Sequence, residues 1–174
     1  MIGFLRFVGV LNGSVWLGAV IFFTLGAAPA LFSDEMLSFL PRAYAGAVAL
    51  VVVKRYFVLQ QVCAVIALAH MFGEWLYTGK PLHRLSLSLL CGLLGLALVS
   101  GYWLQPKMRY LHVIMYAPGP TQEQKEQAGK SFRLLHGAAQ VPNLLILCGL
   151  LVYLWQITNP ANAPRFFSLN KFRE

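Results

Sequence analysis

Four long apolar stretches constrain this chain more than any other feature of its sequence. They cover about residues 7–32, 56–77, 82–104 and 132–157. A stretch of about 22 residues reaches roughly 33 Å as an α-helix, which is enough to cross a hydrocarbon core of ~30 Å. The pattern therefore predicts an all-α integral membrane four-helix bundle, in which residues 1–174 form a single four-span membrane domain.

The amino-acid composition agrees with a membrane location and excludes several other classes of protein. Of the 174 residues, 58% are hydrophobic and 11% are charged. Charged residues make up about 25% of a typical soluble domain. A disordered chain, a collagen and an ordinary soluble enzyme are therefore excluded. We expect the lipid bilayer to surround a multi-pass protein of the plasma or inner membrane.

The formal net charge of +8 does not predict a nucleic-acid partner. Basic residues stand at the ends of the apolar stretches, where membrane helices meet the lipid headgroups. Examples are Arg6, Lys54, Arg55, Lys107 and Arg109. Several aromatic residues near the ends of the stretches form a predicted interfacial belt. They are Tyr56, Trp75, Tyr77, Tyr102, Trp103, Tyr153 and Trp155.

The connecting segments carry their own signals. Ser33-Asp34-Glu35 can begin a helix in the first loop, and Ala43–Val53 is apolar but too short to cross. We expect an extra interfacial helix in this loop, or one long helix that continues into the second span. Pro106 is predicted to end the third span, and residues 158–174 to form a surface tail. Four spans place both termini on the same side of the membrane.

Small residues mark two faces where helices are expected to meet. Gly9 and Gly13 are four positions apart in the first stretch, and Ser88, Gly92 and Gly95 share a face in the third. Small side chains let two helix backbones approach closely in a membrane. This pattern is common in membrane helices and indicates packing rather than a function.

Polar residues inside the apolar stretches are the main candidates for a functional site, because polar groups are costly in lipid. His136, Gln140 and Asn143 follow i, i+4, i+7 spacing and are predicted to share one face of the fourth span, directed into the bundle. The candidate polar seam comprises Asn12, Gln60, His70, Glu74, His136, Gln140 and Asn143. Two interpretations remain open: hydrogen bonds between helices, or a site for a ligand, an ion or a cofactor.

Metal binding is a weaker alternative. Met108, His112 and Met115 share one helical face, and thioether with imidazole suits Cu(I). An amphipathic turn at the membrane surface explains the same spacing. Haem would use His70 or His136, which are expected at different depths in the membrane. No cofactor is expected from the residues alone, and haem or copper stands as the alternative.

Signatures of catalysis are missing from the sequence: it has no paired carboxylates, Gly-rich phosphate loop, GxSxG or HExxH. We therefore expect a protein without evident catalysis. It would act as a small-solute or ion binder, a transport accessory or an assembly partner, through the intramembrane polar seam. A second membrane protein or another copy of this chain is the expected protein partner.

The order of several short motifs resembles the transmembrane protein 205-like family (domain of unknown function 4149). The motifs are Trp16-Leu17-Gly18, Phe22-Phe23, Ala28-Pro29-Ala30-Leu31-Phe32, Ala45-Gly46 and Phe132-Arg133-Leu134-Leu135-His136-Gly137, followed by Asn143. The resemblance covers about residues 10–157. It implies a small four-span membrane protein without an assigned activity, in which His136 and Asn143 are characteristic positions.

Overall fold

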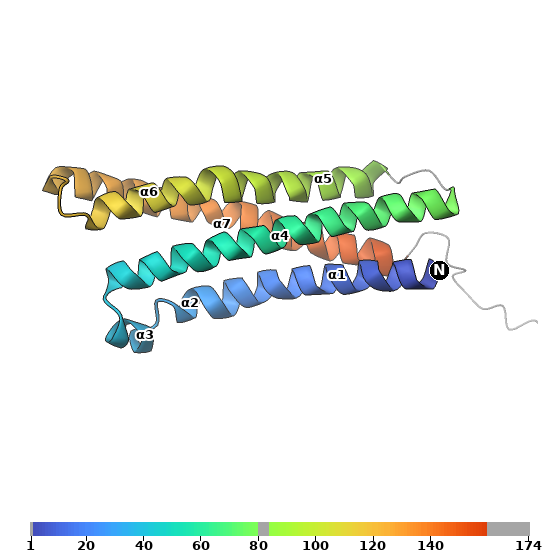
Figure 1. Ribbon diagram of the computed structural model, residues 1–174, viewed down its shortest axis with the longest axis horizontal. Coiled ribbons are helices and arrows are strands. Elements are labelled where there is room, and N and C mark those ends of the chain that lie inside the picture. Colours follow the sequence, from blue (N-terminus) through green and yellow to red (C-terminus); the bar gives the residue numbers. More distant parts are fainter. Residues whose placement is uncertain (1, 80–83, 160–174) are drawn as a thin grey trace, which may run out of the picture.

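The computed structural model describes residues 2–79 and 84–159, and every regular element in these ranges is a helix. Four long rods lie side by side (Figure 1), and each is long and apolar enough to cross a membrane. The predicted all-α four-helix membrane bundle is therefore confirmed. The elements are α1 (Ile2–Phe22), the π-helical turn η1 (Phe23–Ala27), α2 (Ala28–Ala30), α3 (Asp34–Phe39), α4 (Arg42–Thr78), α5 (Arg84–Val99), the π-helical turn η2 (Ser100–Leu104), α6 (Gln105–Tyr116) and α7 (Gln122–Thr158).

The two ends of the bundle differ in what they hold. The start of α1 and the end of α7 meet at one end, which we call the terminal end; there Arg6 Nη2 donates a hydrogen bond to the carbonyl oxygen of Thr158 over 3.0 Å. α3 and the turn between α6 and α7 lie at the opposite end, which we call the loop end (Figure 1). Of the predicted surface tail, residues 160–174 lie outside the described ranges.

Short local motifs set several helix boundaries. Ser33 begins α3, as its sequence predicts, because its hydroxyl accepts a hydrogen bond from the backbone N–H of Met36 over 3.3 Å. Thr121 and Gln124 form a reciprocal capping box at the start of α7. α4 ends at Gly79, whose φ of 63° is left-handed and costs glycine little.

Proline does not end the third span, which corrects the boundary predicted at Pro106. The helix passes through η2, and α6 continues it to Tyr116. A proline inside a helix clashes with the carbonyl group four residues earlier and removes one hydrogen bond. The wider π-helical turn that precedes Pro106 accommodates this defect without breaking the rod. η1 has the same position relative to Pro29 in the first rod.

Two rods are longer than the apolar stretches within them. α4 joins Ala43–Val53 to the second stretch, and α7 joins a charged segment to the fourth; each helix has 37 residues. Such a helix is about 55 Å long, whereas the hydrocarbon core is ~30 Å thick. The bundle therefore exceeds the apolar thickness of a membrane, and the excess lies at the loop end, with α6, the start of α4 and the charged first turns of α7.

The hydrophobic core has two parts. The larger cluster lies among α1, α4, α5 and α7 and consists of Trp16, Val20, Tyr56, Cys63, Ala64, Ala67, Leu90, Leu93, Ile146, Leu150 and Tyr153. A smaller cluster of Leu50, Leu104 and Met108 packs against Phe132 and Leu135 nearer the loop end. Burial of both clusters fixes which faces of α1, α4 and α7 point inward.

Small residues permit close contact in α1 but not in α5. A Cβ atom on Gly9 would lie 2.6 Å from the His70 ring, and one on Gly13 would lie 2.8 Å from Leu154 Cδ2. The contact predicted for this pair is therefore confirmed. Added Cβ atoms on Gly92 and Gly95 would meet no described atom within 4 Å. The contact predicted there is wrong, because this face of α5 points away from the described helices.

Candidate functional site

Buried polar side chains line the contact between α1, α4 and α7 along much of the bundle. We call this group the interior seam; it consists of Asn12, Trp16, Thr24, Tyr56, Gln60, His70, Asn143 and Tyr153. All of them are buried except Thr24 and Asn143, which are partly buried. The predicted members Asn12, Gln60, His70 and Asn143 therefore belong to one interior group.

Three helical rods are joined by one hydrogen-bond network near the loop-end limit of the seam. The Tyr56 hydroxyl donates to Asn143 Oδ1 over 2.7 Å, and Asn143 Nδ2 donates to Thr24 Oγ1 over 2.9 Å. Thr24 in turn donates to the carbonyl oxygen of Val20 over 2.7 Å. The Tyr56 ring also stacks on Phe23 of η1, with 4.1 Å between the ring centroids. This network connects α4, α7 and the first rod.

Nearer the terminal end, the seam joins α1 to α4. Asn12 Nδ2 donates to the carbonyl oxygen of Cys63 over 2.9 Å. One turn earlier in α1, the absence of a side chain at Gly9 makes room for the His70 ring. Gly9 and Asn12 of α1 therefore both bring α4 close, Gly9 by leaving room for the His70 ring and Asn12 by a hydrogen bond.

Several atoms of the interior seam are buried without a hydrogen bond of acceptable geometry in the described part of the chain. They are Trp16 Nε1, Gln60 Nε2 and Oε1, His70 Nε2 and the Tyr153 hydroxyl. Gln60 is fully buried, at 0% exposure. A buried polar group that lacks a partner costs about 1–3 kcal/mol, and nearly all such groups in proteins are paired. The seam therefore has unused capacity for hydrogen bonds.

The remaining predicted members of the seam lie outside it. His136 and Gln140 are exposed, which corrects the prediction that they face inward. Asn143 lies where α7 contacts the first rod. Nearer its start, α7 packs against α6 instead, so the face that carries His136 and Gln140 is not covered by another helix. His136 stacks on Phe132, with 6.1 Å between their rings. Glu74 is likewise exposed, near the terminal end.

The metal candidates do not converge on one point. Met108 and His112 are buried, and Met115 is partly buried. The His112 imidazole interacts with the backbone of Ala43, and its Nε2 atom faces Gly46 of the same helix α4, where an added Cβ would lie 2.5 Å away. The Met115 methyl group instead approaches Gly129 of α7. The described residues contain no group of three or more His, Cys, Asp or Glu side chains that could hold a metal ion.

Sequence reasoning missed the aromatic members of the seam. Tyr56 and Tyr153 are buried, although their positions near span ends predicted an interfacial belt. The other predicted belt residues are exposed, as expected: Trp75, Tyr77, Tyr102, Trp103 and Trp155. Only Trp16 could have been predicted to be interior, because it lies far from either end of its apolar stretch. Its indole N–H gives this aromatic residue a polar atom.

Comparison with known proteins identifies a family and no function. The family described as a domain of unknown function, DUF4149, matches residues 11–117. This range includes Asn12, Tyr56, Gln60 and His70 of the seam but not Asn143. No curated protein and no solved structure matches the chain significantly. The predicted resemblance to domain of unknown function 4149 is confirmed, and the transmembrane protein 205-like name stays a prediction.

Proposed function

This chain belongs to the DUF4149 family, and from that premise we propose that it binds a small, uncharged, hydrogen-bonding solute in the interior seam and gives it a polar path through the bundle. The observation that carries the proposal is Gln60, a fully buried amide that interacts with the Tyr56 hydroxyl but makes no hydrogen bond of full geometry among the described residues. A polar side chain inside a membrane span that no helix contact satisfies is a candidate for ligand binding.

Hydrogen bonding between helices accounts for only part of the seam. Asn12 and Asn143 each bond to a neighbouring rod and so act in this way. Gln60, Trp16 and Tyr153 do not: the polar atoms of Trp16 and Tyr153 have no hydrogen-bond partner in the described part, and Gln60 interacts only with Tyr56 of its own helix. A solute or water molecule that bonds to them would recover the energy lost on burial.

The chemistry of the unpaired atoms favours an uncharged ligand. Trp16 Nε1, Gln60 Nε2 and the Tyr153 hydroxyl are donors, and Gln60 Oε1 is an acceptor. The seam itself contains no Asp, Glu, Lys or Arg. The Glu74 carboxylate, which acts electrostatically on Tyr153, is exposed near the terminal end, so the part of the seam around Gln60 contains no counter-charge for an ion. Water, urea and glycerol have the mixed donors and acceptors that these groups require.

The test measures solute permeability of liposomes that contain the protein. Stopped-flow light scattering after an osmotic step should show faster entry of water, urea or glycerol than in protein-free liposomes. Gln60→Leu should return the rate to the protein-free value, because it removes both polar atoms of the buried amide while keeping a similar side-chain volume. Gln140→Leu is the matched control, since the same change at an exposed position should leave the rate unchanged. Equal rates for wild type and Gln60→Leu would contradict the proposal.

A haem or copper site remains the second candidate, because the buried imidazole of His112 lies one turn from the buried Met108 on α6. Neutral imidazole nitrogen and thioether sulfur are ligands for Cu(I) and for haem iron. Absorbance and metal analysis of the protein purified from membranes test this candidate. A Soret band or stoichiometric copper that disappears in His112→Ala would support it, and neither signal in the wild type would exclude it.

A further inference from the structure

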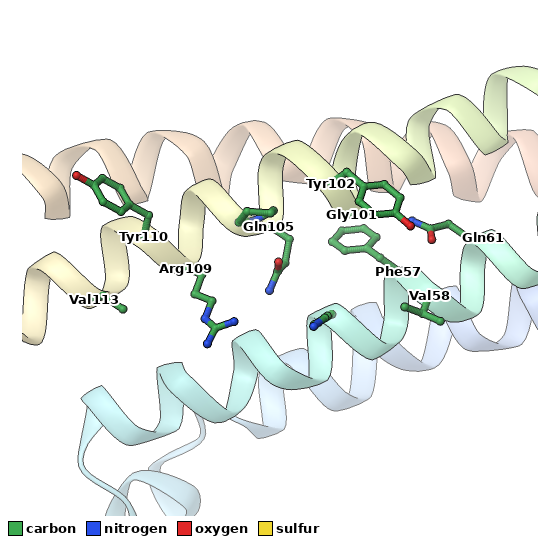
Figure 2. Close-up of a pocket in the computed structure, with 11 residues that line it drawn as sticks. Phe57, Val58, Gln61, Gly101, Tyr102, Gln105, Arg109, Tyr110 and Val113 are labelled. Atoms are coloured by element: carbon green, nitrogen blue, oxygen red, sulfur yellow. The ribbon is translucent and has the colours of Figure 1, made fainter.

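A cavity separate from the interior seam lies on the outside of the bundle, between α4 and the rod formed by η2 and α6. Its volume is about 600 Å³, and no seam residue lines it. Lys54 and Phe57 of α4 face Tyr102 of η2 and Arg109 of α6 across it. Figure 2 shows Arg109 reaching from α6 toward α4, with Phe57 and Tyr102 further along the cavity.

The charge of this cavity is positive. Lys54 and Arg109 line it, and no acidic residue does. The acidic residues of the described ranges stand elsewhere, in α3, near the terminal end of α4 and in the first turns of α7: Asp34, Glu35, Glu74, Glu123 and Glu126. An arginine fork and a lysine ammonium that have no carboxylate beside them suit an anionic phosphate group.

The cavity is also amphiphilic along its length. Lys54 lies two residues before the second apolar stretch, so the charged part of the cavity lies at the level where headgroups are expected. On the terminal-end side of the cations the lining is mostly apolar and aromatic, with Phe57, Val58 and Tyr102, while Tyr110 and Val113 line the loop-end side. Val58 and Tyr102 are 46% and 73% exposed, so this part opens toward lipid. A ligand that fills both parts needs an anionic head and a hydrocarbon chain.

Interactions between its walls hold the cavity at a fixed width. Gln105 Nε2 donates to the carbonyl oxygen of Leu50 over 3.3 Å, and Gln61 Nε2 donates to that of Ala97 over 3.4 Å. A Cβ on Gly101 would lie 2.7 Å from Gln61 Nε2, so the glycine brings η2 against α4 at the apolar end. The walls therefore need little rearrangement to receive a ligand, which lowers the entropic cost of binding.

We propose that this cavity binds an anionic phospholipid. The phosphate group lies between Lys54 and Arg109, and one acyl chain follows Val58 and Tyr102. This lipid site is independent of solute binding in the interior seam. The exposed apolar end distinguishes a lipid from free phosphate, which would use the cations alone.

Native mass spectrometry of the full chain in detergent tests the proposal. The protein is titrated with phosphatidylglycerol and with phosphatidylcholine of the same acyl chains, and inorganic phosphate serves as a competitor. Phosphatidylglycerol should bind more tightly, and phosphate should not displace it at equal concentration. The double variant Lys54→Gln/Arg109→Gln should lose about 30-fold in affinity for phosphatidylglycerol, because each cation near an anionic lipid contributes about five- to sixfold.

Matched controls separate the cavity from a general charge effect. Lys125→Gln/Lys130→Gln removes the same charge from α7, away from the cavity, and should keep wild-type affinity. Val58→Trp, which keeps all charges, should weaken lipid binding by filling the apolar end. Val62→Trp, one turn along α4 and outside the cavity, should not. Equal binding of the two lipids, displacement by phosphate, or equal losses in the test and control variants would overturn the proposal.

Discussion

Asn143 joins three rods through a single amide, and its contribution to stability can be measured. Asn143→Ala removes both hydrogen bonds and leaves the Tyr56 hydroxyl without its acceptor. We expect the free energy of unfolding to fall by about 1–3 kcal/mol, since bonds between membrane helices contribute about 0.6 kcal/mol each and an orphaned buried hydroxyl adds to the loss. Unfolding by titration with a denaturing detergent measures this value.

Gln140→Ala, on the same stripe of α7, is the control at this scale. Its side chain is exposed, so its loss should change the free energy of unfolding by no more than about 0.5 kcal/mol. Equal effects of the two substitutions would mean that Asn143 is no more interior than Gln140.

Helix packing depends on which glycine face is covered. Gly13→Leu should destabilise the bundle by about 1–3 kcal/mol, because an added Cβ already lies 2.8 Å from Leu154 and a larger side chain must force α1 from α7. Gly92→Leu on α5 should leave the midpoint of thermal unfolding in detergent near the wild-type value, since no described atom lies within 4 Å of its added Cβ. A large loss for Gly92→Leu would indicate that another protein chain covers this face of α5.

The arrangement of the whole bundle predicts that both chain ends lie on one side of the membrane. The start of α1 and the end of α7 are joined at the terminal end by the hydrogen bond from Arg6 to Thr158. Single cysteines at Gly3 and Asn159 should therefore react with an impermeant reagent from one face, and a cysteine at Gly119, in the α6–α7 turn, from the other. The background replaces Cys63, Cys91 and Cys148 by alanine, since the last two are exposed. Labelling of Gly3→Cys and Asn159→Cys from opposite faces would refute the four-span topology.

The sequence by itself determined that four helices are long and apolar enough to span, because that property is set by the composition of contiguous segments. It also determined the start of α3 at Ser33, since the groups that close this turn are three residues apart. Among the polar candidates, Asn12, Gln60, His70 and Asn143 were correctly predicted to be interior, because polar groups in apolar stretches avoid lipid.

Only the tertiary structure decided which stripes are covered. The i, i+4, i+7 spacing shows that His136, Gln140 and Asn143 share a face of α7, but another helix must lie across that face to bury them. The first rod meets α7 at Asn143 and leaves the other two exposed. Tyr56 and Tyr153 became interior for the same reason, because neighbouring rods cover them. The spacing of residues along one helix determines in which direction their side chains point around the helix axis. Whether those side chains are buried depends on where the other helices lie.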